Sequence, residues 1–130
     1  MGAYDNCIIL IPALQPDERL IQMIHGLHER GFHKIAVTDD GSSDDRQKYF
    51  QEVEIMGVKV IHHSKKMGKG VALRSALRLA DEKIGESDFY ITADCDGQYS
   101  PEDIEKVAKE LLNNPLRNII NQIGRASCRE

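Results

Sequence analysis

Four short apolar runs, each followed by a stretch with helical periodicity, constrain the fold of this chain more than any other feature. The runs cover residues 6–11, 34–38, 58–61 and 89–93, and each has the length and composition of a buried strand. Strands that alternate with helices predict parallel pairing through crossover connections. We therefore expect an α/β fold of the Rossmann-like type, in which a mostly parallel sheet is flanked by helices.

Turn and capping residues predict where these elements begin and end. Pro12 is expected to end the first strand, which we place at the centre of the sheet, because proline cannot donate to a sheet ladder. Ser42 and Asp45 stand at capping-box spacing, which predicts a second helix that begins at the serines. The segment Ser-Pro-Glu-Asp at 100–103 is a more complete helix start. The expected inner face of the third helix consists of Val71, Leu73, Leu77, Ala80 and Ile84.

Length and composition indicate a single soluble domain. A chain of 130 residues with 41% hydrophobic residues can bury one core. The net charge of -4 and the lack of a basic patch interleaved with aromatic residues argue against a nucleic-acid partner. Cys7, Cys95 and Cys128 lack metal-ligand spacing and are expected to be reduced thiols. The N-terminal apolar run is too short for a signal peptide or a membrane span, so we predict a cytoplasmic protein.

Charged residues follow three of the four predicted strands, at the edge where ligands bind in open α/β sheets. Asp39 and Asp40 begin an Asp-Asp-Gly-Ser turn, and a carboxylate there can accept the N–H of a base such as uracil. A solvated turn is the alternative, because turns use the same residue types. The basic loop at 65–69 leads into a helix, and its glycines and the helix N-terminus suit a phosphate. An exposed lysine-rich loop is the alternative there.

The fourth strand ends in two carboxylates, Asp94 and Asp96, with one residue between them. Two neighbouring carboxylates are most easily accommodated beside a divalent cation. An EF-hand loop is excluded because Tyr99 occupies the position that requires glycine. The pattern of a strand followed by Asp-x-Asp-Gly also occurs in phosphatases with an aspartyl nucleophile. That alternative expects the acids on the first strand, which here leads into Pro12 and Ala13.

The residues of the basic loop exclude a nucleotide-binding P-loop. The loop is not a nucleotide-binding P-loop, because Gly70 is followed by Val71 and not by lysine. His62 and His63 are expected to be loop residues rather than metal ligands, because nothing acidic lies close to them in the sequence. Cys95 is expected to be only the variable residue between the two acids.

Four ordered motifs resemble those of the family 2 glycosyltransferases with the GT-A fold. They are Ile-Pro-Ala at 11–13, Val-Thr-Asp-Asp-Gly-Ser-Ser-Asp at 37–44, Gly-Lys-Gly-Val-Ala-Leu at 68–73 and Ala-Asp-Cys-Asp-Gly-Gln-Tyr-Ser-Pro-Glu-Asp at 93–103. Four motifs in this order over residues 6–114 are far more specific than any one alone. The resemblance implies a nucleotide-sugar donor whose diphosphate is bound through Mg2+ or Mn2+. The last motif is most similar to members that glycosylate a polyprenyl phosphate, which implies a lipid acceptor at the cytoplasmic face of the membrane.

The resemblance also implies roles for individual residues. The nucleotide would be bound by Pro12, Ala13, Asp39, Asp40, Lys69 and Asp94, and the metal by Asp96 and Asp94. Asp40 would contact the base, which is expected to be uracil rather than guanine, and Lys69 would approach the base or the diphosphate. The segment Leu-Gln-Pro at 14–16 departs from the family pattern of an aromatic residue followed by Asn. The resemblance implies that the general base lies in the half of the family's chain that follows the Asp-x-Asp motif.

The last residues of the chain do not resemble the family. Residues 123–130 resemble one reading frame of a common sequencing-adapter DNA. We therefore predict that residues 1–114 form the nucleotide-sugar-binding half of a truncated GT-A domain, that 115–130 form a tail, and that 123–130 are non-native. A genuine exposed tail is the alternative. On this prediction the chain as given binds the donor without turnover, and a non-catalytic nucleotide-binding module is a further alternative.

Overall fold

The computed structural model describes residues 3–96 and 98–113, and their strands form one parallel sheet. The strands are β1 (Cys7–Ala13), β2 (Ile35–Asp39), β3 (Lys59–His62) and β4 (Phe89–Thr92). Their order across the sheet is β3-β2-β1-β4, and every neighbouring pair is parallel. This confirms the α/β, Rossmann-like arrangement and the central position of the first strand.

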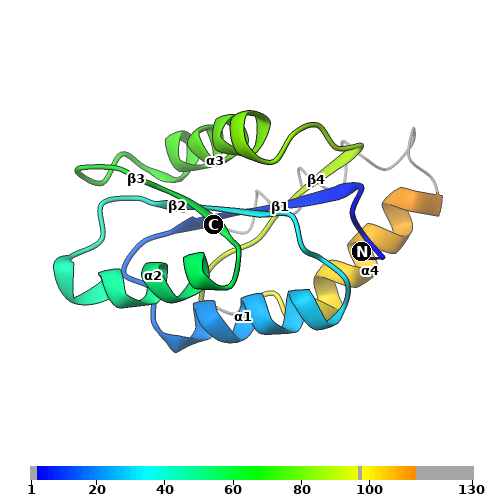
Figure 1. Cartoon of the computed structure of the whole chain (residues 1–130), viewed down its shortest axis with the longest axis horizontal. Helices are drawn as coiled ribbons and strands as arrows, with labels where there is room; N and C mark the ends of the chain where they lie inside the picture. Colours follow the sequence, from blue (N-terminus) through cyan, green and yellow to red (C-terminus); the bar gives the residue numbers. More distant parts are fainter. Residues whose placement is uncertain (1–2, 97, 114–130) are drawn as a thin grey trace.

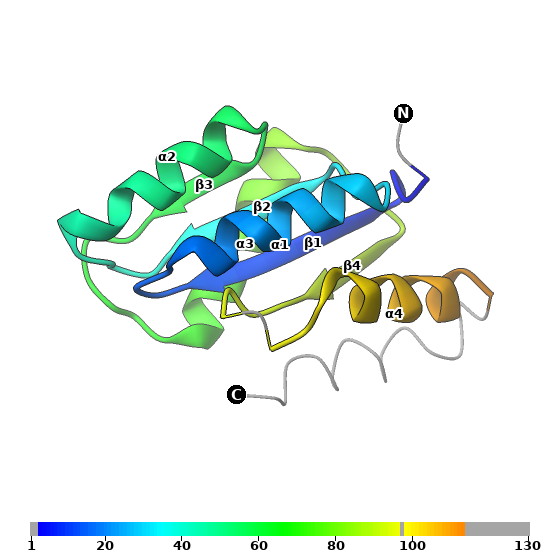
Figure 2. The ribbon, with the colours of Figure 1, turned by 90° about the horizontal axis from the view of Figure 1, so that it is seen from below.

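The helices cover both faces of the sheet. They are α1 (Glu18–Glu29), α2 (Gln47–Ile55), α3 (Lys69–Lys83) and α4 (Pro101–Asn113), and the short 3-10 turn η1 (Asp44–Arg46) precedes α2. Among the described helices, only α3 lies above the sheet in Figure 1, with α1 and α2 below it, and Figure 2 shows α4 lying beside α1 near β4. In the described part of the chain, no helix is long and apolar enough to cross a membrane.

Strand β1 separates two hydrophobic cores. Its side chains alternate. Ile9 and Ile11 pack in the larger core, between the sheet and helices α1, α2 and α4, whereas Ile8 and Leu10 face α3. A strand that is buried on both faces needs apolar residues at every position. This explains why the first strand is a continuous apolar run and not an alternating one.

Helix α3 packs on the sheet through a narrower face than the sequence pattern predicts. Its buried residues are Ala72, Ala76, Leu79 and Ala80. The alanines let the helix backbone lie close to the sheet, and this orientation turns Leu77 outward, where its exposed fraction is 39%. The prediction that Leu77 belongs to the inner face is therefore wrong.

Pro12 lies within β1 rather than at its end, so the predicted strand boundary is wrong. Hydrogen bonds of the Ile9 and Ala13 backbones reach the β2 side, and a parallel strand directs successive backbone groups to opposite sides. The nitrogen of Pro12 therefore faces the β4 side. Pairing with β4 ends at Leu10 and Thr92, so the missing N–H of Pro12 breaks no ladder bond.

One of the two predicted capping boxes forms. At the start of α4, the N–H of Asp103 donates to Ser100 Oγ at 3.1 Å, and the N–H of Ser100 donates to the Asp103 carboxylate at 3.2 Å. The box predicted for Ser42 and Asp45 is absent, because Ser42 Oγ accepts a hydrogen bond from the N–H of Gln15 at 2.9 Å. A contact with the loop after β1 thus replaces the local cap, and η1 precedes α2.

Candidate functional site

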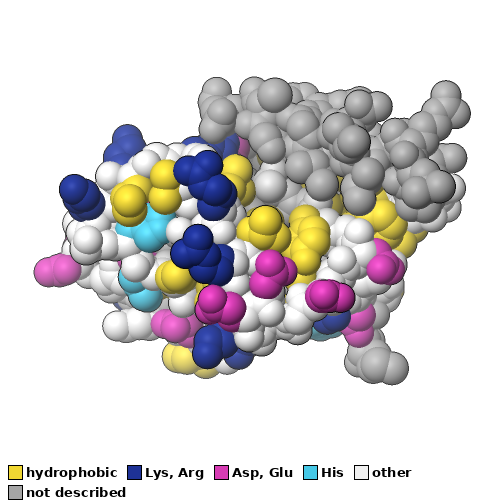
Figure 3. All heavy atoms as spheres, turned by 90° about the horizontal axis from the view of Figure 1, so that it is seen from above, with side chains coloured by type: hydrophobic (Ala, Val, Ile, Leu, Met, Phe, Trp, Pro, Cys, Tyr) yellow, Lys and Arg dark blue, Asp and Glu magenta, His cyan; other side chains and the backbone are white. Residues whose placement is uncertain are grey.

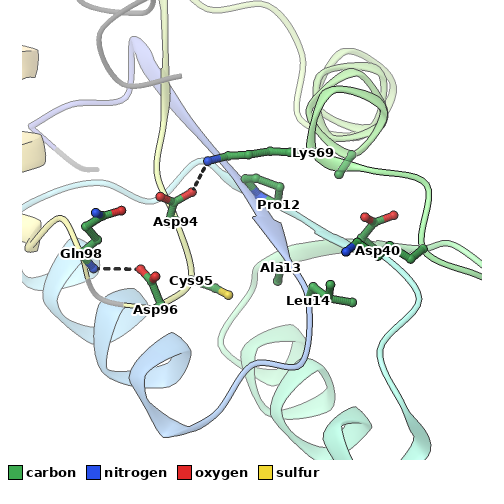
Figure 4. A pocket seen from close by; sticks show the side chains of 11 residues that line it. Pro12, Ala13, Leu14, Asp40, Lys69, Asp94, Cys95, Asp96 and Gln98 are labelled. Atoms are coloured by element: carbon green, nitrogen blue, oxygen red, sulfur yellow. Dashed lines mark hydrogen bonds and ion pairs between the residues drawn. The ribbon is translucent and has the colours of Figure 1, made fainter. Parts of the chain in front are cut away.

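A cavity of about 380 Å³ opens at the carboxyl edge of the sheet. Its size is at the lower end of the range for small-molecule sites. Figure 4 shows the side chains that surround it. The lining residues are Pro12, Ala13, Leu14, Asp40, Lys66, Lys69, Ala72, Asp94, Cys95, Asp96 and Gln98. The structure therefore brings all the sequence-predicted site residues except Asp39 to one cavity.

The parallel sheet explains why these residues meet. Strands β1, β2 and β4 run in the same direction, so the segments that follow them emerge at one edge. Pro12 and Ala13 supply the apolar side of the cavity from β1, and Asp40 follows β2 directly. Lys69 comes from the first turn of α3 on the other side. Residues that are far apart in the sequence thus surround one space.

An ion pair crosses the cavity between Lys69 and Asp94. The Lys69 Nζ atom lies 2.8 Å from Asp94 Oδ1, and the two side chains are only 24% and 18% exposed. The second acid, Asp96, accepts a hydrogen bond at Oδ1 from the N–H of Gln98 at 3.0 Å. One carboxylate is therefore neutralised by a lysine, whereas the other accepts a backbone hydrogen bond.

Asp40 lines the cavity and also holds the basic loop. Its Oδ1 accepts hydrogen bonds from the N–H of Met67 and from His63 Nδ1, both at 2.8 Å, and its Oδ2 accepts the N–H of Gly68 at 3.0 Å. Burial alone raises the pKa of Asp40, but these donors lower it below its ordinary value. Asp40 is therefore an ionised group that fixes the loop before α3.

His63 is a residue of this site that the sequence interpretation missed. Its Nδ1 donates to Asp40, because an ionised carboxylate can only accept, and its Nε2 lies 2.8 Å from Ser75 Oγ on α3. The order of groups is that of a serine hydrolase triad, but Ser75 lies inside a helix whose N–H groups are bonded within the helix. Those amides cannot form an oxyanion hole, so we assign His63 to positioning Asp40.

Asp39 has a different environment from its neighbour. Its side chain accepts hydrogen bonds from the N–H of Ser42 at 2.8 Å, from Gln47 Nε2 at 2.9 Å and from His62 Nδ1 at 2.8 Å. Burial raises the pKa of Asp39, and these donors lower it below its ordinary value. Asp39 does not line the cavity, so its nucleotide-binding role stays a prediction. The register that pairs it with His62 is the signal that identifies this contact.

Gly41 allows the turn after β2 to touch the basic loop. Its φ is +83°, a conformation that favours glycine. A Cβ atom at this position would overlap the backbones of both Lys65 and Lys66. The glycine is therefore required both by the backbone conformation and by the close approach of the two loops.

The comparison with known protein families supplies the identification. Residues 8–129 match the model of Glycosyl transferase family 2. The chain belongs to this family. The resemblance of its four motifs is thereby confirmed, and the α/β sheet has the GT-A arrangement that family 2 implies.

Two curated relatives of this family 2 chain come from archaea. An uncharacterized protein of Methanocaldococcus jannaschii is 32% identical over 108 residues, which are 83% of this chain and 42% of the relative. A UDP-N-acetylglucosamine–dolichyl-phosphate N-acetylglucosaminyltransferase of Methanococcus voltae is 28% identical over 126 residues, which are 86% of this chain and 49% of the relative. The chain thus spans less than half the length of either relative.

The predicted C-terminal tail falls outside the part of the chain that the structure describes. Positions 115–130, including the proposed non-native segment 123–130 and Cys128, lie outside the residues that the structure describes. The family 2 match extends to residue 129. The predicted division at residue 114 stays a prediction.

The acids of this family 2 chain fit a divalent cation that shares its coordination with a ligand. Family 2 glycosyltransferases generally use a divalent metal. The described residues contain no cluster of three or more His, Cys, Asp or Glu side chains that could hold a metal. Asp94 and Asp96 both line the cavity, and Mg2+ typically binds one or two carboxylates together with phosphates and waters. Burial raises the pKa of the Cys95 thiol between them, which favours the neutral, non-ligating form.

Proposed function

We propose that the chain binds a nucleotide-sugar donor across the carboxyl edge of its sheet and that the protein transfers the sugar to a lipid phosphate. The observation that carries the proposal is the single cavity shared by Asp40, Lys69, Asp94 and Asp96. An apolar wall, a hydrogen-bond acceptor, an ammonium group and two carboxylates are the groups that a base, a diphosphate and its metal require.

The base is assigned to the side of the cavity formed by β1 and Asp40. Pro12 and Ala13 offer apolar surface, and the ionised carboxylate of Asp40 can accept the imide N–H that uracil carries. The same carboxylate accepts the loop N–H groups of Met67 and Gly68. Binding of the base would therefore depend on the position of the basic loop. We propose a uridine diphosphate sugar in preference to a guanosine diphosphate sugar, because the relative from Methanococcus voltae carries a name that specifies a UDP-linked donor.

The diphosphate is assigned to the side formed by Lys69 and the two acids. Asp96 and Asp94 would hold Mg2+ or Mn2+, and the cation supplies Lewis-acid stabilisation of the departing diphosphate. The ammonium group of Lys69, in the first turn of α3, places a positive charge on the same side of the cavity. A helix N-terminus adds partial positive charge, which also favours a phosphate.

The acceptor is proposed from one relative rather than from the cavity. The relative from Methanococcus voltae carries a name that specifies a dolichyl phosphate acceptor and a UDP-linked donor. A phosphate oxygen is already anionic at neutral pH, so its attack does not require a strong general base. We propose a polyprenyl phosphate of this chemical kind for the whole protein.

Calorimetric titration tests the donor assignment. UDP is expected to bind in the presence of Mn2+ and to bind more tightly than GDP. Asp96→Ala should weaken Mn2+-dependent UDP binding by on the order of tenfold or more, whereas Asp81→Ala, an exposed position on α3, should leave it unchanged. If neither nucleotide binds, or if Asp96→Ala leaves the metal affinity intact, the site is wrongly assigned.

Two alternatives are separated by further measurements. An aspartyl-nucleophile phosphatase would form a covalent phosphate on Asp94 when incubated with a phosphomonoester, which intact-protein mass spectrometry detects. A non-catalytic nucleotide-binding module would bind UDP and Mn2+ but transfer no sugar, even as the full-length protein. Transfer from UDP-N-acetylglucosamine to a short polyprenyl phosphate by the full-length protein would support the proposed function.

A further inference from the structure

The charges of this chain are divided unevenly along its sequence. Residues 55–80 contain no Asp or Glu, although the whole chain is acidic with a net charge of -4. The basic residues in this segment are Lys59, Lys65, Lys66, Lys69, Arg74 and Arg78. The rest of the chain holds the other eleven basic residues and all twenty-one acidic residues. The protein therefore has a strongly basic segment in an otherwise strongly acidic chain.

The fold places most of this segment on one side of the sheet. The segment comprises β3, the basic loop and most of α3, and α3 is the only described helix on its face of the sheet. Helix α3 turns its alanines inward, and its arginines Arg74 and Arg78 are exposed at the surface. We define the basic face by its exposed side chains, which are Lys65, Lys66, Met67, Arg74, Leu77 and Arg78.

The basic face combines positive charge with exposed apolar side chains. Met67 and Leu77 are 50% and 39% exposed, and both lie among lysines and arginines. Figure 3 looks onto this side and shows dark blue and yellow side chains close together in its left half, with acidic side chains at the left edge and across the lower centre and right of the view. Acidic residues resume at Asp81, in the last turn of α3.

This combination fits an anionic lipid surface better than a nucleic acid. Basic side chains are attracted to anionic headgroups, while neighbouring apolar side chains enter the interface. Nucleic acids attract the same charges but offer no comparable environment for Met67 and Leu77. The six residues of the basic face include no aromatic side chain for stacking on bases. We propose that the basic face docks the protein on an anionic lipid bilayer.

The basic face adjoins the cavity, so docking would bring a lipid bilayer close to the donor site. Lys66 belongs to the basic face and also lines the cavity. A bilayer in contact with this face therefore lies next to the cavity, where a lipid-borne phosphate could reach the donor. Only this consequence rests on the proposed function, because the charge division and the exposed apolar residues are independent of the donor.

Vesicle co-sedimentation tests the docking. The full chain is expected to sediment with vesicles of equimolar phosphatidylcholine and phosphatidylglycerol and to remain in solution with phosphatidylcholine alone. Binding should weaken steeply with salt. The double variant Arg74→Glu/Arg78→Glu should lower the partition coefficient at least about twentyfold, because each basic residue near an anionic surface contributes roughly a factor of five.

A matched variant separates this face from general electrostatics. Lys106→Glu/Lys109→Glu makes the same change in net charge at exposed positions of α4, and it should retain most of the vesicle binding. Met67→Ser/Leu77→Ser should weaken binding without changing the net charge. Circular dichroism confirms that each variant is folded.

Three outcomes would overturn the proposal. They are the absence of sedimentation with the anionic vesicles, an equal loss in the α4 control, and retention on a single-stranded oligonucleotide that exceeds vesicle binding. The UDP titration of Arg74→Glu/Arg78→Glu keeps the two proposals distinct, since neither arginine lines the cavity. Normal UDP binding without vesicle binding would refute the docking alone, whereas vesicle binding without UDP binding would refute the donor site alone.

Discussion

The Lys69 ammonium lies 2.8 Å from the Asp94 carboxylate, so the cavity contains its own cation. A divalent metal that approaches Asp94 alone must compete with this ammonium. A nucleoside diphosphate changes the balance, because its phosphates offer Lys69 an alternative partner. On the proposed function, the metal and the nucleotide should therefore bind together and not one after the other.

Replacement of Lys69 should change the metal and nucleotide affinities in opposite directions. In Lys69→Met, Asp94 loses its competing cation, so the Mn2+ affinity of the nucleotide-free protein should rise about fivefold. UDP affinity at saturating Mn2+ should fall on the order of tenfold, because a diphosphate contact is lost. Calorimetry measures both quantities. Lys109→Met on α4 serves as the control, and a joint fall of both affinities in Lys69→Met would contradict the competition.

His63 and His62 form a natural pair for testing the positioning of Asp40. His63→Ala removes one donor to Asp40, whereas His62→Ala removes one donor to Asp39, which does not line the cavity. Each change should lower the free energy of unfolding by about 1–3 kcal/mol. Only His63→Ala should also weaken UDP binding. Double-mutant cycles with Asp40→Asn should show coupling for His63, and additive effects there would argue against positioning through Asp40.

Gly41 and Gly57 separate backbone strain from steric overlap. Both have a positive φ, but a Cβ at Gly57 has no atom within 4 Å, whereas one at Gly41 meets the backbone of Lys65. Gly57→Ala should therefore lower the free energy of unfolding by about 1 kcal/mol, and Gly41→Ala by about 2–4 kcal/mol. Urea unfolding measures the difference. Equal losses would show that the loop contact is unimportant.

Acid should destabilise the protein through Asp39 and Asp40. The pKa of each carboxyl is lowered in the folded state, so its ionised form stabilises the fold above the ordinary carboxyl value of about 3.9. This stabilisation is lost as the pH falls through that value toward the lowered pKa. Asp40→Asn should be less stable than the parent near neutral pH and should lose less stability on acidification. Urea midpoints between about pH 6 and pH 3 measure this.

An exposed carboxylate provides the comparison for the acid experiment. Asp81→Asn on α3 should change the urea midpoint little at neutral pH and should keep the acid sensitivity of the parent. If Asp40→Asn remains as acid-sensitive as Asp81→Asn, the hydrogen bonds from His63 and the loop do not stabilise the ionised form.

Much of the site could be predicted because it depends on local patterns and one topological rule. Apolar runs placed the strands, and the parallel arrangement brought Asp40, Lys69 and Asp94 to the same edge. The contacts of His63 with Asp40 and Ser75 could not be predicted in this way, because they depend on the β2–β3 register and on how α3 lies over the sheet. Gln15, whose backbone N–H replaces a predicted cap, is a similar case.

The sequence by itself determined that two adjacent aspartates lie at the end of the second strand, in a motif that resembles family 2. Only the tertiary structure decided that Asp40 lines the cavity while Asp39 bonds to Gln47 of α2 and to His62. The physical reason is the alternation of side chains at a strand end, which directs consecutive residues toward opposite faces of the sheet. Two residues of identical chemistry therefore have different partners, and those partners belong to distant parts of the chain.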